Sequence, residues 1–356
     1  MKKEKQLLEL IQAIKPGDPI AANASRKRWN SIAKPLGSLG LLEEAVVKTA
    51  ALTGSKELSF RKKELLVFCA DNGVVSRGVT QQGSNVTAAV ALALAEGRSS
   101  VSPMAGVAGC TVIPIDMGIR DFPGSPGIRN YRVRNGTEDI SRGPAMTREE
   151  CLEAILAGAD VVREEAKKGT DLFAAGEMSI GNTTTATAVT ACLLDIPPEM
   201  ITGRGAGLST AGLARKKQAI REALRINAPD REDAIEVLTK VGGLDIAAMC
   251  GAFLGAAKMR VPILVDGLIS STAALCAARL CLNVKAALLA SHISAEPAGK
   301  LIMDALELKP LIQAEMRLGE GSGAVAAMPL LEMALAVYNS NQTFDKLGIE
   351  PYRKLD

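Results

Sequence analysis

The sequence predicts an α/β fold built on a doubly wound parallel sheet, and two features support this. Short, continuously apolar runs have the length of buried strands and stop at polar, glycine-containing turns, and helical patterns separate them. A strand that is apolar along its whole length is buried on both faces, as in a parallel sheet that helices cover on both sides. Such sheets bind ligands at the carboxyl ends of their strands, where these polar turns fall.

Strands and helices are expected to alternate through the middle of the chain. The expected strands are 65–70, 111–116, 171–177, 261–266 and 285–290. The expected helices are 149–168, 211–225, 231–241, 245–258 and 268–281. The first helix has a clear start, because Thr147 and Glu150 have the spacing of a capping box. The stretch 121–145 is rich in glycine, proline and charge, which predicts a long loop of the kind that is often functional.

These elements predict a large α/β domain over 60–300 that carries the active site. The terminal segments 1–59 and 301–356 show no strand pattern. We expect them to pair as one small helical lobe, since the two ends of a domain often lie close together. The N-terminal residues have an amphipathic pattern that charges interrupt, which indicates a helix rather than a secretion signal.

Composition argues against several classes of function. Lys and Arg total 42 against 39 Asp and Glu, a net charge of +3 that is too balanced for a nucleic-acid or membrane surface. Aromatic residues make up 3% of the chain, whereas proteins that bind single strands stack bases on aromatic side chains. No stretch has the roughly 20 apolar residues of a membrane span. Seven cysteines, an odd number, indicate reduced thiols in a cytoplasmic protein.

The densest candidate site is the stretch 176–186, where an apolar strand ends and a helix of small residues begins. Its glycines let the backbone approach a ligand, and a helix start near Asn182 offers free N–H groups to a phosphate. The alternative is that Asn182 and Thr183 only cap the helix while Gly181 turns the chain. Glu177 favours the functional interpretation, because a carboxylate beside an anion site needs a separate role.

Two other glycine-rich stretches are candidates for ligand contact. The stretch 203–207 lies close in sequence to the basic residues 215–217, which suits an anion. The alternative is that these basic residues form a solvated helix face, and for Lys217 this alternative is favoured. The stretch 317–324 partly resembles a dinucleotide fingerprint, but no strand precedes it, so a nucleotide-dependent dehydrogenase is a distant alternative. A carboxylate between glycines, here Glu320, can instead act as a general base.

The remaining polar turns follow the last two expected strands. Asp266 and Gly267 end one strand, and the stretch 291–297 ends the other, so each places hydroxyls and backbone amides at the sheet edge. His292 is the single histidine, and a lone histidine is more often structural than catalytic. With no CxxC pair, no GxSxG motif and no P-loop, we expect carboxylate-driven chemistry on a phosphate-bearing ligand, without a metal.

Several short motifs follow one another along nearly the whole chain. They are KPLGSLGLLE at 34–43, GT at 136–137, GPAMT at 143–147, GEMSIGNTT at 176–184, GRG at 203–205, VGGLD at 241–245, DG at 266–267, SHISAEP at 291–297 and LGEGSG at 318–323. In this order they resemble the nicotinate-nucleotide:dimethylbenzimidazole phosphoribosyltransferases, which activate the lower base of cobalamin.

The resemblance implies a Rossmann-like domain with a small lobe, assembled as a homodimer. It implies transfer of phosphoribose from nicotinate mononucleotide to an aromatic base, with inversion at the anomeric carbon and release of nicotinate, and it implies no cofactor. Glu320 would be the catalytic base, and Glu177 would stabilise an oxocarbenium-like transition state. The substrate-binding residues expected from the turns and the resemblance are Asn72, Thr80, Gln82, Gly181, Asn182, Thr183, Gly203, Lys216, Asp266, Gly267, Ser291, Ser294 and Arg317.

The sequence departs from the family pattern in the region that forms the base pocket. Asn72 stands where the family usually has histidine, and the segment 78–84 lacks the more familiar family residues. The preferred base therefore stays open among dimethylbenzimidazole, other benzimidazoles, purines and phenols. Some relatives act as pairs of unlike subunits, so the alternative function is a non-catalytic or partner-dependent subunit that binds the nucleotide or the base.

Overall fold

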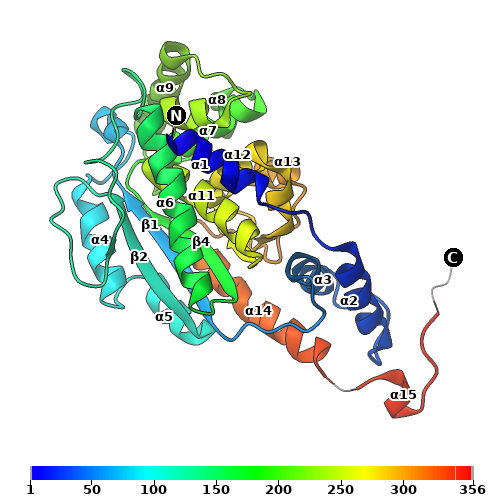
Figure 1. Ribbon diagram of the computed structural model, residues 1–356. Coiled ribbons are helices and arrows are strands. Elements are labelled where there is room, and N and C mark those ends of the chain that lie inside the picture. Colours follow the sequence, from blue (N-terminus) through cyan, green and yellow to red (C-terminus); the bar gives the residue numbers. More distant parts are fainter. Residues whose placement is uncertain (1, 341, 354–356) are drawn as a thin grey trace.

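The computed structural model describes residues 2–340 and 342–353, and its centre is a six-stranded parallel sheet (Figure 1). The strand order is β3-β2-β1-β4-β5-β6. The strands are β1 Lys63–Ala70, β2 Cys110–Gly118, β3 Arg129–Asn130, β4 Leu172–Met178, β5 Ile263–Val265 and β6 Leu288–Ala290. The order reverses between β1 and β4, and ligands bind at such a switch point in doubly wound sheets.

This topology confirms the predicted α/β class with a parallel sheet. Strand residues alternate between two apolar cores, so that Leu66 and Phe68 of β1 face one helical layer while Leu65 and Val67 face the other. This double burial is the reason that the strands are continuously apolar in sequence. One short strand, β3, lies inside the stretch 121–145 that was expected to be a loop throughout.

Helices cover both faces of the sheet. The α-helices are α1 Lys2–Gln12, α2 Pro19–Ser31, α3 Leu41–Thr53, α4 Asn85–Ala95, α5 Val101–Ala108, α6 Arg148–Lys167, α7 Asn182–Leu194, α8 Pro198–Ile201, α9 Thr210–Asn227, α10 Ala234–Val241, α11 Leu244–Met259, α12 Leu268–Leu280, α13 Gly299–Leu306, α14 Ser322–Tyr338 and α15 Phe344–Leu347. Two 3₁₀ turns, η1 Gly73–Arg77 and η2 Leu282–Ala286, complete the list. The capping box predicted at Thr147 and Glu150 is present at the start of α6.

Parts of the two terminal segments, α2, α3 and the end of α14, lie together at one corner of the molecule (Figure 1). Helices α2 and α3 pack on each other, and α14 packs on α3. Trp29 of α2 contacts Tyr338 of α14 with ring centroids 5.1 Å apart, and Arg28 donates to the carbonyl of Ser340 at 2.6 Å. Helix α1 instead packs on α6 and α11, which belong to the large helical layer. The division into 60–300 and a lobe of 1–59 with 301–356 stays a prediction.

Within the described part of the chain, no helix combines the length and the apolar character that crossing a bilayer requires.

Candidate active site

A cavity of about 280 Å³ lies at the carboxyl edge of the sheet, just below the roughly 300–1,000 Å³ that is usual for ligand sites. Most of the predicted site residues line it: Glu177, Glu320, Gly181, Asn182, Thr183, Asp266, Gly267, Ser294, Arg317 and Thr80. The other predicted residues are not among the lining residues: Gly203, Lys216, Ser291, Asn72 and Gln82. Polar turns far apart in sequence therefore converge on one site.

The two glutamates belong to the same wall of this cavity. Glu177 is the penultimate residue of β4, and Glu320 precedes α14 in a loop that packs directly on β4. A Cβ atom at Gly176 would lie 2.8 Å from the backbone nitrogen of Gly321, and one at Gly319 would lie 2.7 Å from Oε1 of Glu177. Glycine at both positions therefore allows the close approach that brings the two carboxyl groups together.

Glu320 is held in a defined position. Its Oε2 accepts a hydrogen bond from the backbone nitrogen of Val101 at 3.0 Å, and the residue is 9% exposed. Its φ of +58° is uncommon for a residue with a side chain. Such strained backbone positions gather at functional sites. The other carboxylate oxygen, Oε1, remains available for a ligand in the cavity.

Asn182 joins Glu177 to a third carboxylate. Its side-chain Nδ2 donates to Oε2 of Glu177 and, at 3.1 Å, to Oδ2 of Asp245. Asp245 is fully buried in the first turn of α11. The amide of Asn182 therefore fixes the side chain of Glu177 relative to the sheet edge.

The carboxyl groups in this cluster bind protons unusually well. Burial, reinforced by the negative charges of Asp245, Asp266 and Glu320, raises the pKa of Glu177 to about 8, although the hydrogen bond from Asn182 opposes the shift. Burial also raises the pKa of Asp245 to about 6. We therefore expect Glu177 to retain its proton at neutral pH, and a cationic ligand to favour its ionised form.

Another buried pair that lines the cavity, Asp266 and His292, follows the ends of β5 and β6. Oδ1 of Asp266 accepts from the backbone nitrogen of Ala324 at 2.9 Å and lies 3.8 Å from Nδ1 of His292. Burial raises the pKa of Asp266, and the adjacent histidine opposes that rise. The hydroxyl of Ser291 donates to the carbonyl of Val265 at 2.6 Å, so its oxygen can accept a hydrogen bond from Nδ1–H of His292 at 3.1 Å. This hydrogen-bond pattern indicates that His292 carries a proton on Nδ1.

The phosphate end of the predicted site centres on the start of α7. Nζ of Lys216 donates to Oγ1 of Thr183 at 2.8 Å and to the carbonyl of Gly203 at 3.2 Å. Lys216 is fully buried behind the wall, and this burial lowers its pKa to about 8. Helices α7 and α12 both begin at the cavity, and their positive ends favour an anion there.

Comparison with known proteins places the chain in a family. A family model described as a phosphoribosyltransferase matches residues 14–349. The chain belongs to this phosphoribosyltransferase family. The nicotinate-nucleotide–dimethylbenzimidazole phosphoribosyltransferase of Acetivibrio thermocellus is 44% identical over 92% of the chain and 93% of its own length. The protein of that name from Ruminiclostridium cellulolyticum is 42% identical over 98% of the chain and 99% of its own.

Solved structures agree with this assignment. The crystal structure of CobT from Thermus thermophilus superposes with a TM-score of 0.89 at 38% identity, covering 93% of the chain and 99% of that structure. The family resemblance and the enzyme class predicted from the sequence are therefore confirmed, as is the family fold. The roles of individual site residues stay predictions.

The segment 78–84, which was expected to help form the base pocket, reaches the cavity of this phosphoribosyltransferase. Thr80 and Gln81 line it, and Nε2 of Gln81 is bonded to the carbonyl of Gly207. Asn72 is buried just behind it, where its Nδ2 donates to the carbonyl of Ile180 at 3.3 Å. Among the described residues that line the cavity there is no Phe, Tyr or Trp.

Sequence reasoning missed several residues of this site. Asp245 lies inside a quoted motif but was not selected, and Arg204 and Glu296 line the cavity from stretches in which other residues were chosen. The signal for Asp245 was available, since a carboxylate just after a pair of glycines at a helix start is well placed to face a sheet edge. His292 lines the cavity with buried hydrogen-bond partners, so it combines a structural environment with access to a ligand.

Proposed function

We propose that this phosphoribosyltransferase moves phosphoribose from nicotinate mononucleotide to a benzimidazole-type base, which yields an α-ribotide and nicotinate for cobamide nucleotide-loop assembly. The observation that carries the proposal is the pair of carboxyl groups on one cavity wall, Glu177 and Glu320, beside a helix start suited to a phosphate. The relatives that cover nearly the whole chain carry the name of this reaction.

In the proposed reaction a ring nitrogen of the base attacks the anomeric carbon on the face opposite nicotinate. The bond from that carbon to the pyridine nitrogen breaks, and its electron pair returns to the nicotinate ring. Glu320 accepts the proton from the second ring nitrogen of the base. Glu177, in its ionised form, stabilises the positive charge that develops on the ribose.

The remaining polar groups would bind the phosphate. The start of α7 at Asn182 and Thr183 supplies backbone N–H groups and the positive end of a helix dipole. Lys216 would act through Thr183, because its ammonium group orients that hydroxyl from behind the wall. Ser294, Arg317 and Gly267 would complete the ribose and phosphate contacts from the facing loops.

The direct test incubates the purified chain with nicotinate mononucleotide and 5,6-dimethylbenzimidazole and measures nicotinate and α-ribazole phosphate. We expect turnover by the chain alone, which would exclude the need for an unlike partner subunit. Failure to turn over any benzimidazole, purine or phenol would contradict the proposed reaction.

We further propose that the enzyme is a cytoplasmic homodimer that associates through α4 and α5. The seven cysteines are free thiols, which suits a reducing compartment. Neither helix carries a charged residue, yet both are partly exposed, and Val107 of α5 is 87% exposed. Apolar helices with exposed faces are typical of subunit interfaces. Val90 of α4 also lines the cavity, so this face adjoins the site.

The oligomeric state is predicted to respond to one charge on that face. The wild-type chain should have twice its mass of 37.2 kDa by light scattering. Val107→Glu should shift it toward the monomer, because a desolvated charge is costly at an interface. Met200→Glu is the matched control, since Met200 is also exposed (71%) but lies on α8. A monomeric wild-type protein would contradict the proposal.

Broad acceptance of bases is a further prediction. The described residues that line the cavity include no Phe, Tyr or Trp, so stacking should contribute little to selection. One buried methyl group is worth about 1–3 kcal/mol even in a good apolar pocket. In a competition between equimolar bases we expect unsubstituted or hydroxylated benzimidazole, or a purine, to compete well with dimethylbenzimidazole.

Neighbouring glutamines supply the control for this competition. Gln81→Ala should change the product ratio, whereas Gln82→Ala should leave it unchanged, because Gln81 lines the cavity and Gln82 does not. A preference of the wild type for dimethylbenzimidazole above about 100-fold would show that the pocket selects its methyl groups.

A further inference from the structure

The loop between β4 and α7 is held by side chains from other segments. The backbone nitrogen of Ile180 donates to Oγ1 of Thr87 at 3.2 Å, and its carbonyl accepts from Nδ2 of Asn72 at 3.3 Å. The backbone N–H and the backbone carbonyl of Ile180 are therefore both hydrogen-bonded to side chains outside the loop. Ile180 lies between Glu177 and Asn182, so its backbone position determines how those two side chains meet.

Thr87 can serve both of its hydrogen bonds in one arrangement only. Its hydroxyl donates its single proton to Oδ1 of Asp71 at 2.7 Å, so a lone pair faces the N–H of Ile180. Both Thr87 and Asp71 are fully buried, where water cannot replace either partner. The carboxylate also polarises the hydroxyl and makes it a better acceptor for Ile180.

Asp71 is in turn anchored by the turn that follows β2. Its Oδ2 accepts from the backbone nitrogen of Arg120 at 2.8 Å, and its own backbone nitrogen donates to the carbonyl of Gly118 at 3.0 Å. The backbone nitrogen of Thr137 donates to the carbonyl of Asp71 at 2.9 Å. Asp71 therefore has hydrogen bonds to three segments besides its own, and it has little freedom to move.

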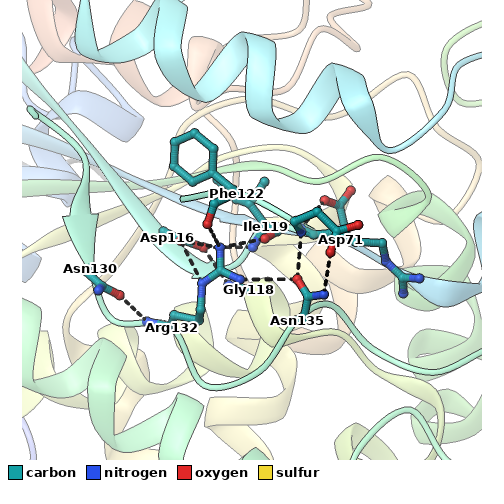
Figure 2. Close-up of polar contacts among 10 residues, drawn as sticks. Asp71, Asp116, Gly118, Ile119, Phe122, Asn130, Arg132 and Asn135 are labelled. Atoms are coloured by element: carbon teal, nitrogen blue, oxygen red, sulfur yellow. Dashed lines mark hydrogen bonds and ion pairs between the residues drawn. The ribbon is translucent and has the colours of Figure 1, made fainter. Parts of the chain in front are cut away.

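Figure 2 shows how the turn itself is built. Oδ1 of Asp116 accepts from the backbone nitrogens of Gly118 and Ile119 at 2.9 and 2.8 Å. The guanidinium of Arg132 binds Oδ2 of Asp116 and the carbonyls of Ile119 and Phe122, the latter two at 2.7 Å each. The turn is thus closed on both sides of Arg120, whose N–H is directed at Asp71.

We propose that Thr87 and Asp71 are positioning residues for phosphoribosyl transfer, which fix the backbone of Ile180 and thereby the contact of Asn182 with Glu177. The proposal rests on the proposed function for its kinetic consequence. Neither residue is among those that line the cavity, so neither is expected to contact substrate. Their effect should fall on the alignment of the reacting groups rather than on the occupancy of the site.

Replacement of one hydroxyl tests this. Thr87→Val keeps the shape of the side chain and removes both hydrogen bonds, whereas Thr87→Ser keeps the hydroxyl. We expect Thr87→Val to lower kcat by about 10–100-fold with KM for the nucleotide changed less than about threefold, because small misplacements of reacting groups are costly. Thr87→Ser should recover most of the lost kcat.

Thr190→Val is the matched control. Thr190 is also fully buried, and its hydroxyl pairs with that of Thr272 at 3.0 Å, farther along α7. It does not line the cavity. Both valine variants should lower the melting temperature, but only Thr87→Val should lower kcat. Equal losses of kcat in the two variants, or a loss that serine does not rescue, would overturn the proposal.

Hydrogen exchange separates this inference from the proposed function. In the ligand-free protein, Thr87→Val should accelerate exchange of the Ile180 amide, while Thr87→Ser and Thr190→Val should leave it unchanged. If the wild type transferred to no base, the proposed reaction would fail while this measurement still decided the positioning role. Unchanged exchange at Ile180 in Thr87→Val would overturn that role.

Discussion

Glu320→Gln is expected to reduce phosphoribosyl transfer by about 10²–10⁴-fold, the usual contribution of general base catalysis. The substitution removes the proton acceptor and little else. The hydrogen bond from the backbone nitrogen of Val101 to the side-chain oxygen can be retained by the glutamine carbonyl, so the loop before α14 should keep its position. The loss should therefore appear in kcat, whereas the affinity for the nucleotide should change little.

Single-turnover kinetics and calorimetric titration with nicotinate mononucleotide measure the two quantities separately. Glu315→Gln is the control, because Glu315 is exposed on the segment leading to the same loop and also has a positive φ. It should transfer at the wild-type rate. An unchanged rate in Glu320→Gln would show that Glu320 is structural and that another group accepts the proton.

The sheet could be predicted because burial of its strands on both faces produces a local sequence pattern, a continuous apolar run. Strands such as 65–70 are apolar at every position, since alternate residues pack into two different cores. Strand β3 could not be found in the same way, because two residues carry no periodic pattern. Helices α4 and α5 were missed for a related reason: they are nearly uniformly apolar, so they show no amphipathic period.

The site was predictable where one turn carries its own signal and less so where distant segments meet. The stretch around Glu177 could be recognised in the sequence by its glycines and by the helix that begins after it. Asp245 joins it only because α11 begins beside β4, which is a tertiary contact. Lys216 was expected near the phosphate, but its burial behind Thr183 depends on how α9 packs against α7. The support of Ile180 by Thr87 has no local sequence signal.

Glu177 should make stability and activity depend on pH in opposite directions. The pKa of its carboxyl group is raised to about 8 in the folded protein, chiefly by burial. Below its ordinary pKa of 4.5, folded and unfolded chains both hold the proton. Between about 4.5 and 8 the unfolded chain has released the proton and the folded chain has not, so a rising pH favours unfolding. Above about 8 this contribution is constant.

The free energy of unfolding should therefore decline by about 1–2 kcal/mol between pH 6.5 and 9. This value is smaller than the whole pKa shift of Glu177 would give, because the side chain borders an open cavity where solvent screens its charge. This window lies above the pKa of Asp245, which is about 6, so that group contributes little to the slope. Glu177→Gln cannot ionise, and its stability should be flat over the same window. Urea unfolding at several pH values measures the difference.

The activity should follow the ionised form. For the wild type, kcat/KM for nicotinate mononucleotide should rise with pH and level off above about 8, since this ratio reports the pKa of the free enzyme. Glu177→Gln should lose that rise and, at pH 9, be about 10²–10³-fold slower, because a neutral amide stabilises a developing positive charge far less than a carboxylate does. Asp230→Asn, at an exposed site away from the cavity, should keep both profiles of the wild type. A Glu177→Gln enzyme with the wild-type pH profile would assign the ionisation to another group and remove Glu177 from the charge-stabilising role.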